Sequence, residues 1–591
     1  MCASPLRPGL VGRYVAAMAV AFAAQAAGQG PCEQIAAACA SAGFVRGAAA
    51  AGNGTVRDCI EPIMQGAPQP RRATKPLPEI SPQVVSACRE QDPQFGQVQP
   101  PPAQRAGQTA SATPSPAPVT GPGPPLPAAA TAAKRPNFVF ILTDDLAWNL
   151  VPYMPRVLAM QKAGVTFSNY FVTDSLCCPS RSSIFTGRYP HDTGVFRNTG
   201  KDGGYLVFRD RGLENFTFAT WLSAAGYRTA MLGKYLNGYL PAAHRPAPGW
   251  TAWAVAGNGY PEFNYNLSQD GRVVRYGSAP EDYLTDVLSG LAVRFIRQSG
   301  DAPFLIEVAT FAPHAPYTPA PRDAEALPGL RAPRTPAFNA APELEAPKWL
   351  LNHPELSAAD ITMIDSDFRK RAQSVLAVDR MIGELQAVVA AIGQQGNTYF
   401  VFSSDNGYHM GEHRLMPGKM TAFDEDIHVP LIITGPGVPA AAVVDQIVDN
   451  IDLCPTFAEL GGAVAAANVD GDSLAPFLRG QTVSQWRNVA LVEHRGPHND
   501  PTDPDAPAIR SGNPTTYEAL RASTSLYVEY NDGEREYHDL RTDPHELRNT
   551  YSSLAPAQKE ALHAMLVAIK NCHDATSCRA AERSGAVAAG R

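Results

Sequence analysis

Residues 138–145, with the sequence FVFILTDD, set the fold class of the chain. The five apolar residues that open this segment are typical of a strand buried on both faces of a sheet. Similar patterns recur downstream, as strands at 303–309 (PFLIEVA) and 399–403 (YFVFS) and as helices at 155–162, 214–225 and 358–392. Strands that alternate with helices predict an α/β fold in which helices flank a large, mostly parallel sheet.

Two of these strands end in acidic residues. Asp144 and Asp145 follow the first strand, and Asp405 and Asn406 follow the strand at 399–403. Ligands of open parallel sheets bind beyond the carboxyl ends of the strands, so neighbouring strands would bring these four side chains together. Three carboxylates and an amide oxygen suit Ca²⁺ or Mg²⁺ better than zinc. The alternative is that the aspartates form turns and cap helices, but two such pairs together favour a metal site.

Composition excludes two broad classes of protein. Of the 591 residues, 45 % are hydrophobic and 18 % are charged, which supplies a large core and excludes global disorder. The formal net charge is -7 and no basic stripe is evident, so we expect no nucleic-acid partner.

Proline and cysteine divide the N-terminal part of the chain. Proline accounts for 54 of the 591 residues, and ten of these prolines lie between residues 100 and 127. We therefore assign residues 93–134 to a proline-rich linker. Residues 28–92 fit either a small helical module with two disulfides or a loosely ordered tail. The cysteines concerned, whose pairing stays open, are Cys32, Cys39, Cys59 and Cys88.

The first residues have the pattern of a secretory signal. Two arginines precede a short apolar run at 14–24, and Ala24 and Ala26 supply the small residues that a signal peptidase requires. We predict a signal peptide at 1–27 and a secreted or periplasmic protein, with a retained N-terminal anchor as the alternative. No other apolar run approaches the ~20 residues that span a bilayer, so we expect no membrane span.

The body of the chain divides into two predicted domains. Residues 135–460 contain the strands and helices described above and form the larger domain. Residues 461–580 form a smaller domain, and residues 581–591 a tail. Because every acidic strand end lies in the larger domain, we expect it to carry the functional site.

The smaller domain contains a hairpin signal. Residues 526–540 alternate around an Asn-Asp-Gly turn, which predicts a β-hairpin. A helical pattern at 556–570 follows. Cys572 and Cys578 are spaced to close a small disulfide loop, which export permits, whereas a zinc site is disfavoured because no second cysteine pair follows.

The most specific segment is residues 177–188, CCPSRSSIFTGR. An adjacent cysteine pair by itself indicates a buried or disulfide-bonded structural pair. Here the pattern C-x-P-S-R followed by T-G-R resembles the signature of the type I sulfatases, and other motifs of that family occur along the chain. They are LTDD at 142–145, GKYLN at 233–237, APHAP at 312–316, SDNGYHMGEH at 404–413, GKMTAFDED at 418–426 and YHDLRTDPHELRN at 537–549. The resemblance covers about residues 135–580 and is strongest to the N-acetylglucosamine-6-sulfatase branch.

The resemblance implies an alkaline-phosphatase-like sulfatase fold, whose smaller C-terminal domain is an antiparallel sheet with a helix. It implies hydrolysis of a sulfate ester, here the 6-O-sulfate of N-acetylglucosamine or a related sulfated sugar of the glycosaminoglycan type. It also implies that a formylglycine-generating enzyme oxidises Cys177 to formylglycine. One hydroxyl of the formylglycine hydrate attacks sulfur, and the other later expels sulfate.

The resemblance also implies roles for individual side chains. Arg181 orients the nucleophile, and Lys234 and Lys419 clamp the sulfate. His314 lies between two prolines and fits either a general acid or a loop histidine, and the resemblance places it at the sulfate and the leaving oxygen. The implied ligands of the metal ion, Ca²⁺ or else Mg²⁺, are Asp144, Asp145, Cys177 as formylglycine, Asp405 and Asn406.

One position departs from the pattern of many sulfatases. They carry a histidine two residues after the first lysine, where this chain has Leu236. The N-acetylglucosamine-6-sulfatase branch has the same departure, so activity is still expected. The base of the elimination step stays open among His191, His409 and His413, each of which also fits a structural role.

Two other functions remain open at this level. An arylsulfatase, or a phosphonate or phosphodiester hydrolase, would use the same nucleophile on another ester. A non-catalytic sulfoglycan-binding protein would keep Cys177 as a thiol.

Overall fold

The computed structural model describes residues 31–42, 44, 59–65, 75–78, 80–91, 134–500, 503 and 505–583. The predicted signal peptide, all but one residue of the predicted linker and most of the predicted tail lie outside these ranges. The chain forms two compact units, Met1–Leu126 and Pro127–Arg591.

The described part of the first unit contains three helices, α2 (Pro31–Ser41), α3 (Glu61–Gln65) and α4 (Pro82–Gln91). Disulfides join Cys32 to Cys88 and Cys39 to Cys59, which is the pairing that the sequence left open. The four cysteines are buried in one small apolar cluster with Ile35. Because so few apolar residues build this cluster, the cross-links supply the stability that a larger core would give.

The second unit is built on a ten-stranded sheet with the order β10-β2-β9-β8-β1-β7-β3-β4-β5-β6. The strands are β1 (Asn137–Thr143), β2 (Val165–Phe171), β3 (Arg228–Lys234), β4 (Ala252–Ala256), β5 (Asn266–Gln269), β6 (Arg272–Arg275), β7 (Phe304–Ala309), β8 (Thr398–Ser404), β9 (Leu431–Thr434) and β10 (Ala442–Asp449). The central strands β8, β1, β7, β3 and β4 are parallel to one another. The prediction of a large, mostly parallel sheet is therefore confirmed. Antiparallel strands β5, β6 and β9 were not predicted.

The continuous apolar run of β1 is explained by burial on both faces. Phe138, Phe140 and Leu142 contribute to one apolar cluster, while Val139 and Ile141 contribute to the other. Successive side chains of a strand point to opposite faces, so a strand covered on both sides needs apolar residues at every position.

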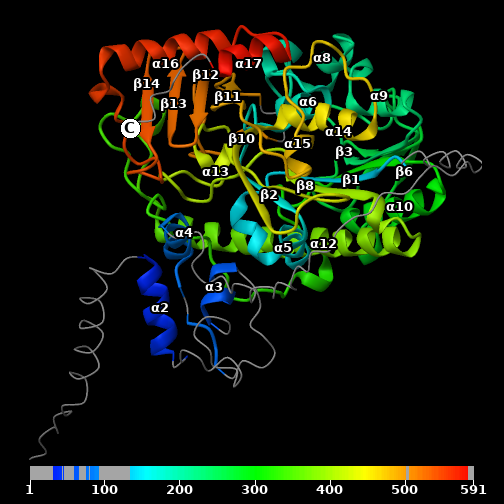
Figure 1. The fold of residues 1–591 in the computed structure, drawn as a ribbon, viewed down its shortest axis with the longest axis horizontal. Coiled ribbons are helices and arrows are strands. Elements are labelled where there is room, and N and C mark those ends of the chain that lie inside the picture. Colours follow the sequence, from blue (N-terminus) through cyan, green and yellow to red (C-terminus); the bar gives the residue numbers. More distant parts are fainter. Residues whose placement is uncertain are drawn as a thin grey trace, which may run out of the picture. The chain divides into compact units, whose positions relative to one another are not determined.

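Helices cover both faces of this sheet (Figure 1). On one face lie α5 (Pro155–Ala163), α10 (Leu284–Ser299) and the 34-residue α12 (Ala358–Ala391). On the other lie α6 (Cys177–Thr186), α8 (Gly204–Asp210), α9 (Phe218–Ala224) and α14 (Leu453–Gly461). Shorter helices are α7 (Pro190–Thr193), α11 (Lys348–Leu351), α13 (Asp424–Ile427) and α15 (Ala475–Leu478). The pattern at 214–225 yields two pieces rather than one helix, because the side chain of Thr217 caps α9 at the Thr220 N–H.

A separate four-stranded antiparallel sheet follows near the C-terminus (Figure 1). Its strands are β11 (Val489–His494), β12 (Tyr517–Ala522), β13 (Ser525–Tyr530) and β14 (Arg535–Asp539). The predicted hairpin is confirmed, because β13 and β14 pair across the Asn-Asp-Gly turn. Helices α16 (Pro556–Ile569) and α17 (Ala575–Arg583) pack on this sheet, and the Cys572–Cys578 disulfide lies between them.

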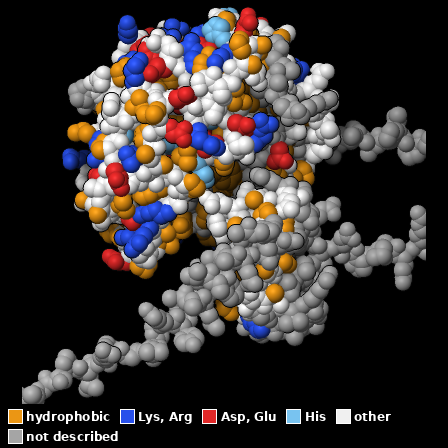
Figure 2. All heavy atoms as spheres, turned by 90° about the vertical axis from the view of Figure 1, so that its left-hand side faces the viewer, with side chains coloured by type: hydrophobic (Ala, Val, Ile, Leu, Met, Phe, Trp, Pro, Cys, Tyr) orange, Lys and Arg blue, Asp and Glu red, His pale blue; other side chains and the backbone are white. Residues whose placement is uncertain are grey.

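Charges of both signs are interspersed on the face of the molecule drawn in Figure 2. No helix in the described ranges is long and apolar enough to cross a membrane.

Candidate active site

Cys177 is the first residue of α6 and is fully buried. The helix ends at Gly187, which adopts a left-handed conformation with φ 68°. Because Cys177 is at the other end of the helix, the positive end of the helix dipole lies at residue 177, a position that favours negative charge. Cys177 and its neighbour Cys178 are both free thiols, so the adjacent pair is not a disulfide.

Asp144, Asp145, Asp405 and Asn406 lie together beyond the ends of β1 and β8. The parallel register aligns Thr143 with Ser404, which places the residues that follow side by side. The Asp145 N–H donates to Asp405 Oδ1 at 3.1 Å, and Asn406 Nδ2 donates to Asp145 Oδ1 at 2.7 Å. Asp145 has φ 62°, a strained conformation that is uncommon outside glycine and that often marks functional residues.

These residues fit a divalent cation. Ligand atoms of Asp144, Asp145, Cys177 and His314 all lie within 4.8 Å of one another, and all four residues are buried. The Asn406 Oδ1 atom is also buried and finds no hydrogen-bond partner within the described part of the chain. A buried carbonyl oxygen without a donor is costly, and a cation among these oxygens would satisfy it.

Three cationic side chains surround the same point. Lys419 Nζ lies 2.7 Å from Asp145 Oδ1 and 2.9 Å from Cys177 Sγ. Lys234, at the end of β3, places Nζ 2.6 Å from Asp144 Oδ2. Arg181 extends from α6, where its Nε donates to Asp405 at 2.8 Å and its Nη1 to the Lys234 carbonyl at 2.9 Å. The predicted catalytic cations are thus brought together from three distant segments.

His314 completes the cluster from the segment after β7. Its Nδ1 lies 2.7 Å from the Ala315 carbonyl, which requires a proton on Nδ1. Its Nε2 faces the site, 3.6 Å from Asp145 Oδ2. Burial alone would lower the pKa of His314, but the nearby carboxylates of Asp145 and Asp144 raise it above the ordinary value.

The pKa values at the site reflect burial and charge together. Burial raises the pKa of Asp144 to about 6 in spite of Lys234. Burial opposes ionisation of Asp405 as well, but Arg181 and the two lysines lower its pKa to about 2. Burial and then Asp144 raise the pKa of the Cys177 thiol well above its usual range. As encoded, Cys177 is a neutral thiol and a weak nucleophile.

Asp505 is a member of the site that the sequence analysis missed. Its Oδ1 accepts hydrogen bonds from Lys419 Nζ at 2.7 Å and from His314 Nε2 at 2.5 Å. Its Oδ2 accepts from the amides of Asn198 at 2.7 Å and Asn237 at 2.9 Å. The residue lies in an Asp- and Pro-rich segment with no motif or periodicity, so nothing in the sequence singled it out.

The three histidines considered as elimination bases have structural partners. His191 contacts Glu493 and the Cys572 carbonyl at 2.8 and 2.9 Å. His409 contacts Asp426 at 3.0 Å and the Ser511 carbonyl at 2.8 Å. His413 stacks on Phe423 with ring centroids 3.9 Å apart. None of the three belongs to the buried cluster around Cys177.

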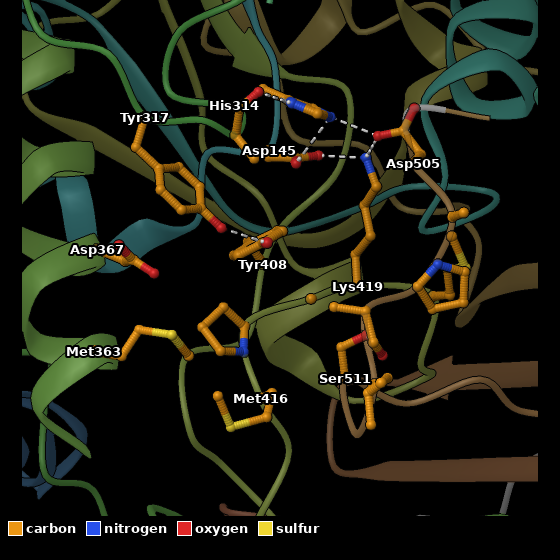
Figure 3. Close-up of a pocket in the computed structure, with 18 residues that line it drawn as sticks. Asp145, His314, Tyr317, Met363, Asp367, Tyr408, Met416, Lys419, Asp505 and Ser511 are labelled. Carbon is orange, nitrogen blue, oxygen red and sulfur yellow. Dashed lines mark hydrogen bonds and ion pairs between the residues drawn. The ribbon is translucent and has the colours of Figure 1, made fainter. Parts of the chain in front are cut away.

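A pocket of about 370 Å³ opens onto this cluster (Figure 3). His314, Lys419 and Asp505 lie at its inner end, where dashed lines join them. The remaining walls are mostly apolar and include Tyr317, Tyr408, Met363 and Met416. An apolar pocket with a few converging polar groups is typical of a small-molecule site.

Comparison with known proteins identifies the family. The sulfatase family model matches residues 136–463, and a model described as N-sulphoglucosamine sulphohydrolase, C-terminal, matches residues 411–571. The chain belongs to the sulfatase family. The resemblance inferred from the sequence motifs is thereby confirmed, and this sulfatase is a sulfuric ester hydrolase.

Several characterised sulfatases are similar over most of their length. The N-acetylglucosamine-6-sulfatases of Capra hircus and Homo sapiens are each 34 % identical to this sulfatase, over 484 and 483 residues. These alignments cover 76 % of this chain and 86 % and 87 % of the relatives. A solved structure of a protein in complex with its substrate D-glucosamine-2-N,6-O-disulfate shares the fold, with a TM-score of 0.62 and 24 % identity. That match covers 73 % of this chain and 97 % of the other.

Proposed function

We propose that this sulfatase removes the 6-O-sulfate of N-acetylglucosamine or of a related sulfated sugar, with residue 177 as the nucleophile. The main support is the position of Cys177, buried at the start of α6 between Lys419 Nζ at 2.9 Å and Asp144 Oδ1 at 3.3 Å. The sugar preference follows from the 34 % identity to N-acetylglucosamine-6-sulfatases. The pocket beside the cluster has the size and apolar walls that suit a sugar ring.

Two groups complete the proposed chemistry. Formylglycine, made from Cys177 by a formylglycine-generating enzyme, supplies as its hydrate the hydroxyl nucleophile that a neutral thiol lacks. A divalent cation, which we propose is Ca²⁺, supplies positive charge next to the sulfuryl oxygens. It would be held by Asp144, Asp145, Asp405, Asn406 and residue 177.

The chain's own cations bind and orient the ester. Lys419 and Lys234 point at the space beside residue 177 and bind the sulfuryl oxygens, where negative charge accumulates during the reaction. Arg181 is a positioning residue, because it ties Asp405 to the carbonyl of Lys234. Removing a preorganised donor such as Lys419 or Lys234 costs about 10²–10³ in kcat.

His314 is the proposed general acid for the leaving sugar oxygen. The Ala315 carbonyl holds the proton on Nδ1 and aims Nε2 into the site. The carboxylates of Asp145 and Asp144 raise the pKa of the ring, so Nε2 carries a proton to donate as the ester bond breaks. The leaving sugar then departs as a neutral alcohol.

The location of the protein is also proposed. Three disulfides, Cys32–Cys88, Cys39–Cys59 and Cys572–Cys578, fit an exported protein, because thiols in the cytosol stay reduced. We propose that the sulfatase is secreted or periplasmic.

The decisive experiment combines mass and turnover. Conversion of Cys177 to formylglycine lowers the mass of its peptide by about 18 Da, and turnover of N-acetylglucosamine 6-sulfate should accompany it. Cys177→Ala should abolish turnover, whereas Cys454→Ala, which removes another buried free thiol, should not. An unmodified Cys177 together with full activity would refute the proposed nucleophile.

The proposed metal is tested by chelation. A chelator should abolish turnover and lower the thermal denaturation midpoint, because three buried carboxylates then lose their counter-ion. Calcium should restore both properties better than magnesium. Full activity after exhaustive chelation would exclude a role for a divalent ion.

A further inference from the structure

We propose that a second, basic pocket beside the catalytic cluster binds an acidic group on the sugar next to the one that carries the scissile sulfate. The basic pocket is lined by Arg197, Lys201, Asp202, Arg495, His498 and Asp500, among others, and has a volume of about 420 Å³. The assignment of its ligand rests on the proposed function, since it concerns the same sulfated sugar chain.

The charge of the basic pocket favours an anion. Among the described residues that line the pocket, Arg197, Lys201 and Arg495 face two acidic residues. Asp202 lies 3.9 Å from Arg197, and Asp500 accepts a hydrogen bond from Thr199 at 2.8 Å. Among the described residues, neither Lys201 nor Arg495 has an acidic ion-pair partner. The described lining of the pocket is therefore net positive in a protein whose formal net charge is -7.

Two buried side-chain nitrogens at the basic pocket find no hydrogen-bond partner among the described residues. His498 is only 6 % exposed, and its Nε2 finds no hydrogen-bond partner in the described part of the protein. The Nε of Arg197 is likewise buried and finds no hydrogen-bond partner among the described residues, although Asp202 Oδ1 lies 3.9 Å away. Burial, together with His494 and Arg197, lowers the pKa of His498 to about 3, so the ring is neutral and one ring nitrogen carries a proton. A carboxylate or sulfate oxygen would satisfy donors of this kind.

The walls of the basic pocket are held in place before any ligand binds. The guanidinium of Arg495 lies 3.8 Å from the centre of the Phe196 ring. The backbone of His498 forms two hydrogen bonds with the side chain of Asn513, both 2.8 Å long. The Phe196 N–H donates to the Asp202 carbonyl at 2.8 Å. Because these groups are already ordered, little conformational entropy is lost when an anion binds.

Asn198 connects the basic pocket to the catalytic cluster. It directly follows Arg197, accepts a hydrogen bond from the Cys178 N–H at 2.9 Å and donates to Asp505 at 2.7 Å. Asp500 lines the basic pocket and Asp505, five positions later in the sequence, lines the pocket of Figure 3. A sugar chain with one sulfate at Lys419 can thus present a second anion here.

The ligand is a sulfate or carboxylate on an adjacent sugar. Arginine pairs with both groups through its planar fork of donors. Substrates for the test are a 6-sulfated N-acetylglucosamine monosaccharide and three disaccharides that end in it. Their neighbouring sugars carry a carboxylate, a second sulfate or only hydroxyl groups.

The test compares the Lys201→Ala/Arg495→Ala double variant with a control that removes two exposed charges elsewhere, Lys162→Ala/Arg541→Ala. The double variant should lose about tenfold or more in kcat/KM on an acidic disaccharide and remain unchanged on the monosaccharide and the neutral disaccharide. Loss with only one of the acidic disaccharides identifies the group that is bound. The control variant should keep the wild-type kcat/KM on all four substrates.

Two results would overturn the proposal that the basic pocket binds an acidic group of the substrate. One is a wild-type enzyme with no preference for acidic over neutral disaccharides, and the other is an equal loss on all substrates in the double variant. Failure of the proposed function looks different, because no 6-sulfated sugar would then be turned over. In that case the proposal for the basic pocket is tested by measuring direct binding of the acidic disaccharides that lack the 6-sulfate. Binding by wild type that is lost in the double variant supports the proposal. No binding by wild type overturns it.

Discussion

At the scale of single residues, Asp505 places a negative charge among the side chains that are proposed to bind the sulfate. The proposed catalytic cluster contains the cations Arg181, Lys234 and Lys419. Its anions are Asp144, Asp145, Asp405 and Asp505. A sulfate ester brings one more negative charge to donors that Asp505 already occupies. The substrate and Asp505 therefore compete for Lys419 and His314.

This competition predicts the behaviour of Asp505→Asn. The variant loses the negative charge that opposes the sulfate and keeps one oxygen that can accept from Lys419 and His314. Its amide nitrogen cannot accept the hydrogen bonds that Asn198 and Asn237 donate to the Asp505 carboxylate. We expect KM for the sulfate ester, and the inhibition constant of inorganic sulfate, to fall about three- to tenfold, which corresponds to about 0.7–1.4 kcal/mol. Steady-state kinetics measure both constants.

Asp503→Asn is the matched control for this variant. Asp503 accepts hydrogen bonds from the Asp505 N–H at 3.0 Å and from Asn198 at 3.4 Å, and the ion pairs with Lys419 and His314 are made by Asp505 instead. Its substitution should leave the sulfate inhibition constant within about twofold. A rise in KM for Asp505→Asn would instead make Asp505 a substrate-binding group.

At the scale of elements, the site depends on how closely strands β3 and β7 approach. Gly233 precedes Lys234 at the end of β3 and has φ 101°. A Cβ atom at this position would lie 1.9 Å from the Ala309 carbonyl oxygen of β7. Only glycine allows both this backbone conformation and this contact. The position of Lys234 therefore depends on residue 233 having no side chain.

Gly233→Ala should therefore damage both stability and catalysis. The clash is with backbone and cannot be relieved by a rotamer change, so we expect a loss of about 3 kcal/mol or more in the free energy of unfolding. The displacement of Lys234 should lower kcat at least about tenfold. Gly437→Ala is the control, because Gly437 has φ 76° but nothing within 4 Å of its Cβ position. Gly437→Ala should lower the free energy of unfolding by about 1–2 kcal/mol and leave kcat unchanged. Equal effects of the two variants would refute the argument that β3 and β7 need glycine at position 233.

Elements with regular patterns were predictable from the sequence, whereas other features depended on tertiary structure. Helix α12 was predicted at 358–392 and runs from Ala358 to Ala391, because Ser357 and Asp360 form a capping box at its start. The Asp and Asn residues after β1 and β8 were predictable because parallel strands end at one edge of the sheet. Asp505 was not, because no local pattern links it to Lys419, 86 residues away. Strand β9 was missed for the same reason, because its partners β2 and β8 are distant in the sequence. The β5–β6 hairpin has a local signal, the Asp270-Gly271 turn, that the sequence interpretation missed.

At the scale of the whole molecule, the large sheet domain and the C-terminal sheet meet around His191. This residue belongs to α7, its Nδ1 lies 2.8 Å from the Glu493 carboxylate of β11, and its Nε2 lies 2.9 Å from the Cys572 carbonyl beside the disulfide. Arg487 reinforces the same junction, with Nη1 2.6 Å from Asp452 and Nε 3.2 Å from Glu582. The junction is polar and charged, so its strength should depend on pH.

His191 sets the sign of that dependence. Burial opposes its protonation, but Glu493 raises its pKa to about 9, above the ordinary value of 6.5. A raised pKa stabilises the fold fully below pH 6.5, and this contribution is lost as the pH rises through 9. Wild type should therefore lose about 2–3 kcal/mol of unfolding free energy between pH 6.5 and pH 9.5 that His191→Gln does not lose. Urea denaturation at a series of pH values measures the difference.

His573→Gln is the control, because it removes a largely exposed histidine beside Asp192. Its unfolding free energy should depend on pH as that of wild type does. If wild type and His191→Gln instead show the same pH dependence of the unfolding free energy, His191 is neutral in the folded protein.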